Sequence, residues 1–151
     1  MDPTSTRMAF APTTELEPDE QLLARITGDR ATYWREHAWL AAFAMAGGMA
    51  ILWAVGSEHI WTGAVGGLAA IAVRGLYLAS DETKMEWQLT DRRLLGPGSR
   101  AILLENVATV RTIFSAVQVV TVTGDKHLLK FQADPVDVIA RIERAKAARA
   151  A

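Results

Sequence analysis

Cysteine is absent from the 151-residue chain, which excludes disulfide bonds, thiolate metal sites and cysteine nucleophiles. Histidine is scarce, and His37, His59 and His127 are too few and too scattered to indicate a metal site. The formal net charge is also close to zero, at -1, so the protein has no overall field that would attract nucleic acid or acidic ligands. We therefore expect no cofactor, no metal and no nucleic-acid partner.

Catalytic motifs are missing too. The sequence contains no nucleophile elbow, phosphate-binding loop, zinc-protease motif or suggestive pair of carboxylates. Residues 56–59 (GSEH) include a serine, a glutamate and a histidine, but so small a loop offers no scaffold that excludes water. The start of the chain also lacks the basic and apolar regions of a secretory signal. We expect a non-enzymatic protein.

Charge is absent from one long apolar stretch and almost absent from a second. Residues 38–55 carry no charge, and residues 60–79 carry only Arg74, which can reach lipid headgroups by snorkelling. At about 1.5 Å per residue, each stretch is close to the ~30 Å of a hydrocarbon core. The sequence predicts a transmembrane helical hairpin over residues 38–79. A buried hairpin in a soluble protein is the alternative.

The flanking charges predict how this hairpin is oriented. Arginines precede the first span, and Lys84, Arg92 and Arg93 follow the second, whereas the connecting loop has no lysine or arginine. Positive charge favours the cytoplasmic side of a membrane. Both termini are therefore expected in the cytoplasm.

Small residues recur at helical spacing within both spans. Gly63 and Gly67 form a GxxxG pair, and Ala46, Ala50 and Ala54 form a ridge. Such ridges let helix backbones approach closely. We favour packing between the two helices of one hairpin, because the short loop already holds them together, over an oligomer interface.

The residues before the first span divide by composition. Residues 1–19 are rich in proline, threonine and acidic residues, so we expect a disordered tail. Residues 20–37 form a juxtamembrane segment, in which 20–27 suits either a short strand or a helical turn. Trp34 and His37 lie at helical spacing near the membrane, where interfacial anchoring is favoured over a binding role.

The hydrophobic period changes after Ser80. Residues 84–90 alternate apolar and polar side chains, which predicts a half-buried strand with Trp87 in the core. Turn residues separate it from further short strands at 93–96, 101–114 and 117–132.

A helix follows these strands. Asp134 suits its N-cap and Pro135 its first position. Its expected apolar stripe consists of Val136, Ile139, Ile142 and Ala145. Its exposed side is basic and includes Arg141 and Arg144.

These stretches resemble a known family. The sequences EWQLTDRRLL at 86–95, ILLENVATV at 102–110 and TGDKHLLKFQADP at 123–135, with the closing helix, are similar to the bacterial pleckstrin-homology-like domain of small membrane proteins. The resemblance implies that residues 82–151 form a cytoplasmic binding module behind two spans in a bacterial inner membrane. The module is short for a seven-stranded barrel unless residues 20–27 add a strand.

The turn residues Arg92 and Arg93 allow two interpretations. They are candidate contacts for anionic headgroups or for an acidic patch of a partner. Alternatively, one of them pairs with Asp91 or Glu105 and fixes the turn, which is the interpretation we favour for Arg93.

The expected fold is an α+β membrane protein, in which a helical hairpin precedes a small antiparallel β module closed by a C-terminal helix. The expected function is binding or scaffolding within a membrane complex, with lipids and another membrane protein or a second copy as partners. The alternative is sensing of anionic lipid. The candidate contacts are Arg92, Arg93, Arg141 and Arg144.

Overall fold

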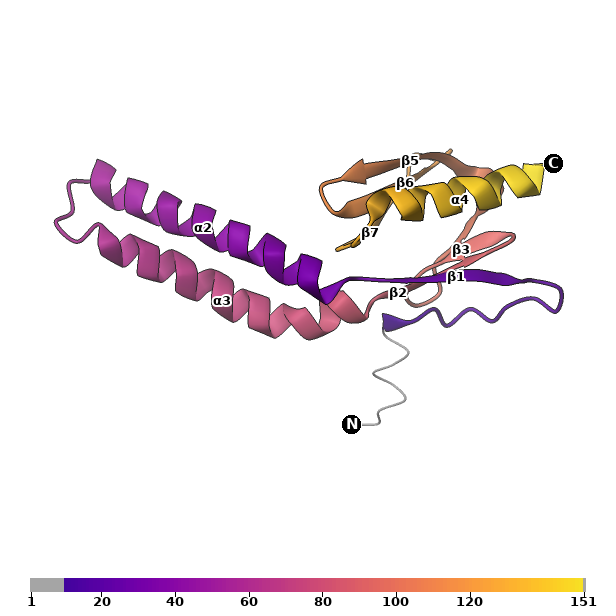
Figure 1. Ribbon diagram of the computed structural model, residues 1–151, viewed down its shortest axis with the longest axis horizontal. Coiled ribbons are helices and arrows are strands. Elements are labelled where there is room, and N and C mark those ends of the chain that lie inside the picture. Colours follow the sequence, from indigo (N-terminus) through magenta and orange to yellow (C-terminus); the bar gives the residue numbers. More distant parts are fainter. Residues whose placement is uncertain (1–9, 151) are drawn as a thin grey trace. The chain divides into compact units, whose positions relative to one another are not determined.

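The computed structural model describes residues 10–150, so residues 1–9 of the expected tail lie outside it. The elements are β1 (Leu22–Thr27), α2 (Arg30–Ala54), α3 (Trp61–Lys84), β2 (Glu86–Thr90), β3 (Arg93–Leu95), β4 (Ala101–Leu103), the short 3-10 helix η1 (Leu104–Asn106), β5 (Val107–Ile113), β6 (Ala116–Thr121), β7 (Lys126–Leu129) and α4 (Pro135–Ala150) (Figure 1). The chain is of the α+β class expected from its sequence.

The helical hairpin is inserted into a β domain. The chain divides into two compact units: residues 30–80, and a β unit built from the residues on both sides of them. In the β unit, β1 pairs antiparallel with β2, although the hairpin separates them in sequence. Residues 22–27 thus form a strand, which settles the alternative left open above. The segment 20–37 divides between this strand and the first turns of α2.

The strands of the β unit form two antiparallel sheets. One sheet has the order β1-β2-β3-β4, and the other has the order β5-β6-β7. Period-two alternation places Trp87 and Leu89 of β2 and Val117 and Val119 of β6 in one buried core. Trp87 is thus a core residue, as expected. Its ring lies against Gly96, where an added Cβ would lie 2.6 Å from the ring.

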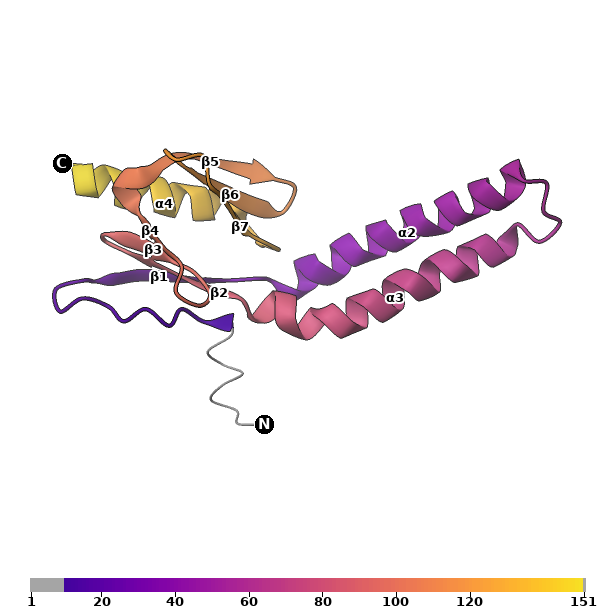
Figure 2. The same cartoon turned by 180° about the vertical axis from the view of Figure 1, so that it is seen from behind.

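Helix α4 covers part of this core. Its N-cap is confirmed, because the backbone N–H of Asp137 donates to Asp134 Oδ1 at 3.0 Å. Both views show α4 beside the second sheet (Figures 1 and 2), and it packs against β5, β6 and η1. The predicted stripe was partly wrong. Val136 is 73% exposed, and Val138 is buried beside Ile142. The predicted stripe and the observed buried residues, Val138, Ile142 and Ala145, both have helical spacing. Packing against the sheets decides which of the two faces is buried.

Residues 11–19, in the second part of the expected tail, make backbone contacts within the β unit. The N–H of Thr13 donates to the carbonyl of Gly98 at 2.9 Å, and the N–H of Gly98 donates to the carbonyl of Ala11 at 3.1 Å. These bonds join the segment that precedes β1 to the connection between β3 and β4. Glu17 and Glu20, which precede β1, also contact Arg92 and Arg93 through their side chains.

Within the hairpin, α2 and α3 approach closely at glycine positions. A Cβ added at Gly63 would lie 2.4 Å from the backbone of Gly48, and one at Gly67 would lie 2.5 Å from the carbonyl oxygen of Ala44. Ala46 and Ala50 are exposed and do not take part in this contact. The glycine pair of α3 therefore meets Ala44 and Gly48 of α2.

This contact predicts that Gly63→Val destabilises the hairpin, because the new side chain would meet helix backbone that cannot move aside. We expect a loss of roughly 1–3 kcal/mol, typical of overpacking, measured as a lower thermal midpoint of the full chain in detergent. Gly66→Val is the matched control, because a Cβ at Gly66 meets nothing within 4 Å. Equal midpoints for the two variants would contradict the observed packing.

Candidate functional site

The first candidate residues, Arg92 and Arg93, lie at the turn between β2 and β3. The Arg93 side chain is 13% exposed and pairs with the carboxylate of Glu20, whose side chain is fully buried. Arg93 Nε donates to Glu20 Oε1 at 3.0 Å, and Arg93 Nη2 donates to Glu20 Oε2. This is a bidentate, charge-assisted pair between residues on opposite sides of the helical hairpin in sequence.

Further donors complete the hydrogen bonding of Glu20. The Thr90 hydroxyl donates to Oε1 at 2.6 Å, and the Glu17 N–H donates to Oε2 at 3.0 Å. The hydrogen bonds from Arg93 hold the pKa of Glu20 at about 2, below its ordinary 4.5. Burial opposes this shift, while Thr90 and Glu17 add to it. Glu20 is therefore charged at neutral pH.

Arg92 is also paired. Its Nη1 donates to Glu17 Oε2 at 2.8 Å, and its Nε lies 3.9 Å from Asp91 Oδ2. The alternative in which one of the two arginines pairs with Asp91 or Glu105 is met by Arg92, which lies beside Asp91, whereas the partner of Arg93 is Glu20. The one feature of the sequence that pointed to these ion pairs was the acidic composition of the segment before β1. Opposite charges so far apart in a chain do not by themselves indicate contact.

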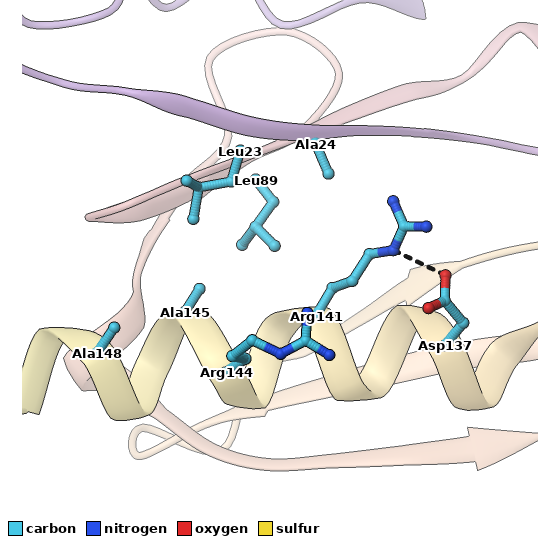
Figure 3. Close-up of a pocket in the computed structure, with 8 residues that line it drawn as sticks. All are labelled: Leu23, Ala24, Leu89, Asp137, Arg141, Arg144, Ala145 and Ala148. Carbon is cyan, nitrogen blue, oxygen red and sulfur yellow. Dashed lines mark hydrogen bonds and ion pairs between the residues drawn. The ribbon is translucent and has the colours of Figure 1, made fainter.

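The other two candidate residues, Arg141 and Arg144, lie together on the edge of a groove. The groove has a volume of about 420 Å³ and separates α4 from β1 and β2. Leu23, Ala24 and Leu89 line one side, and Asp137, Arg141, Arg144, Ala145 and Ala148 line the other (Figure 3). Leu23 and Ala24 point from β1 toward α4, and Arg141 reaches from α4 toward β1 (Figure 3).

The charge at the groove is positive. Arg141 Nε donates to Asp137 Oδ2 at 2.7 Å, one turn earlier on the same helix. Arg144 forms no ion pair with any residue from 10 to 150. The floor of the groove is apolar, because it is formed by Leu89 and Ala145, which are both buried. An apolar floor with a basic rim suits a ligand that carries both apolar and anionic groups.

The aromatic residues of α2 have structural partners. The Tyr33 hydroxyl donates to the carbonyl of Gly75 at 2.9 Å, and the His37 ring stacks on the Tyr33 ring with 4.0 Å between centroids. His37 Nδ1 lies 3.0 Å from the Tyr33 carbonyl oxygen. Trp34 meets Tyr33 edge to face. These contacts join the start of α2 to the later part of α3.

No group of three or more metal-ligating side chains is present among residues 10–150. In the GSEH loop, the backbone N–H of His59 donates to Ser57 Oγ at 3.2 Å, and His59 is exposed.

Comparison with known proteins found no match. No family model, no curated protein and no solved structure is similar to this chain at a significant level. Any proposal for its function therefore rests on the helices, the groove and the charged residues described here.

The Glu20 pair predicts a specific loss of stability in acid. Because folding lowers the pKa of Glu20, its contribution is present above about pH 4.5 and is lost as the pH falls toward 2. The shift corresponds to about 3 kcal/mol at neutral pH. We expect Glu20→Gln to be less stable at pH 7 and to lose less stability between pH 5 and pH 2.5.

This prediction is tested by urea unfolding of the full chain in detergent across that pH range. Glu143→Gln is the control, because Glu143 is an exposed carboxylate on α4. It should keep the pH dependence of the wild type. Identical pH profiles for Glu20→Gln and the wild type would contradict the assigned role of the pair.

Proposed function

We propose that this chain is a non-enzymatic, two-span membrane protein whose β unit binds another membrane protein at the cytoplasmic surface, as a subunit or assembly factor of a membrane complex. The observation that carries the proposal is the apolar, basic-rimmed groove between α4 and β1. The β unit is covalently continuous with both apolar helices, so attachment to the membrane would raise its effective concentration beside other membrane proteins.

The apolar surface of α2 and α3 supports membrane insertion. Both helices are long and apolar enough to span a bilayer, and only 0% and 6% of their most apolar windows are buried. Phe43 is 70% exposed, and Trp53 is 72% exposed. Soluble proteins rarely expose so large an apolar surface to water, whereas a bilayer would solvate it. The lysine and arginine distribution favours cytoplasmic termini.

The arrangement of strands supports the resemblance to the bacterial pleckstrin-homology-like domain. With β1 included, the β unit has the seven strands that residues 82–151 alone lack, in sheets of four and three with a closing helix. That resemblance is the basis for a bacterial inner membrane as the location. It constrains the shape of the module more than its partner.

Sensing of anionic lipid is the second candidate function. The pairing of Arg92 and Arg93 with acidic residues weakens their part in this hypothesis. Arg144 favours it, because its guanidinium has no ion pair among residues 10–150 and is exposed. Each basic residue near an anionic leaflet contributes about 1 kcal/mol.

The orientation can be tested with single cysteines, because the natural chain has none. Ser57 lies between the helices and Ser99 between β3 and β4. We expect a membrane-impermeant maleimide to label Ser57→Cys in intact cells and Ser99→Cys only after permeabilisation. The reverse pattern would overturn the orientation, and release of the chain by alkaline carbonate would overturn membrane insertion.

The binding role is tested by purifying the full chain from its native membrane in mild detergent. We expect another membrane protein to co-purify in a fixed ratio, identified by mass spectrometry. Recovery of the chain with anionic lipid alone would instead favour lipid sensing. A chain that purifies with neither in any mild detergent would contradict both candidate functions.

A further inference from the structure

One edge of the first sheet is open. β1 is the end strand of this sheet, and its only strand partner within residues 10–150 is β2. In an antiparallel ladder, every second residue directs its N–H and C=O groups away from the partner strand. The edge of β1 is also poorly protected, since Leu22 is 37% exposed and Leu23 is 52% exposed. An exposed apolar edge is a template for another strand.

The end of β1 lies near the end of β7. Just after β1, the N–H of Asp29 donates to the carbonyl of Phe131 at 2.6 Å, close to the end of β7. Within the described residues, β1 and β7 are not paired as strands. The groove beside α4 lies along β1 at Leu23 and Ala24. The backbone groups of β1 that have no strand partner among residues 10–150 therefore lie next to an apolar groove.

The charges beside this edge select the kind of segment that would bind. Arg141 and Arg144 lie on the groove, and one carboxylate, that of Asp137, offsets them. Asp137 is already engaged by Arg141, which leaves Arg144 to pair with an incoming anion. The groove thus carries a net positive charge above an apolar floor. A partner of complementary chemistry carries carboxylates and apolar side chains on one extended segment.

We propose that the groove binds an acidic, extended peptide segment of a partner protein, which adds to the edge of β1 as a further strand. Backbone hydrogen bonds to β1 provide affinity. Apolar side chains of the segment cover Leu23 and Ala24, and its carboxylates meet Arg141 and Arg144. This inference rests on the proposed binding function and identifies the chemistry of the partner.

A lipid headgroup fits the same charges less completely. A phosphate could pair with Arg144, but a lipid has no repeating donors and acceptors to match the open edge of β1. Leu23, on that edge, is 52% exposed and would remain uncovered by a headgroup. The peptide accounts for the backbone edge, the apolar floor and the basic rim together, and lipid binding becomes an outcome of the test.

The experiment measures binding of a fluorescent peptide to the full chain in detergent by anisotropy. The probe is a short peptide that alternates valine and glutamate. Its two controls are the same peptide with alternate amides N-methylated, which removes backbone donors, and a version with lysine in place of glutamate. We expect micromolar binding of the probe and loss of about tenfold or more with either control peptide.

Matched protein variants locate the site. Arg144→Glu should weaken probe binding about tenfold, because it reverses a charge on the groove. Arg100→Glu is the control, since Arg100 is exposed, lies outside the groove and makes the same change in net charge. Leu23→Asp should also weaken binding by placing a carboxylate on the edge itself. Circular dichroism of each variant verifies that it folds.

Three results would overturn the proposal: equal binding of the N-methylated peptide, equal losses for Arg144→Glu and Arg100→Glu, or binding of anionic lipid vesicles but not of the probe. After any of these results, the proposed binding of another membrane protein can still be tested separately by co-purification. A membrane partner that still co-purifies in fixed ratio would show that the binding function holds and that the groove is not its site. Failure of both experiments would reject the binding function as well.

Discussion

The pairing of β1 with β2 is the interaction on which the rest of the structure depends. These strands lie on opposite sides of the helical hairpin in sequence, so their ladder brings the two ends of the hairpin segment back to one place. The bidentate pair of Glu20 with Arg93 extends this connection beyond the last ladder residues. Without β1, the first sheet would lose its end strand, and the groove beside α4 would lose a wall.

The same arrangement separates two pairs of arginines that look equivalent in sequence. Arg92 and Arg93 lie near an acidic segment that precedes β1, and their charges are used within the fold. Arg141 and Arg144 lie on α4 beside the open groove, where a single carboxylate engages one of them. The first pair thus stabilises the fold, and the second pair is the better candidate for contact with a partner.

Much of the fold was predictable because its signals are local. The long apolar stretches, one without charge and one with only Arg74, indicated both long helices. Alternation along 84–90 indicated β2, and Asp134 with Pro135 marked the start of α4. The sequence indicated less clearly which small residues of α2 contact α3. Ala46 and Ala50 have the same spacing as the residues that meet, yet Gly48 and Ala44 form the contact with α3. Spacing defines a set of faces, and close packing of backbones selects one of them.

The sequence by itself determined the presence of two long apolar helices, the order of most strands and the lack of cysteine chemistry, because composition and period act over a few neighbouring residues. It did not determine the ends of the helices, since α2 begins at Arg30 and α3 ends at Lys84, both beyond the apolar stretches. The tertiary structure alone decided that residues 22–27 complete the first sheet, that Glu20 neutralises Arg93 and that Arg141 and Arg144 border a groove. Each of these depends on contacts between residues far apart in the chain. Such contacts leave no periodic trace in a sequence, because they form only when the whole β unit closes.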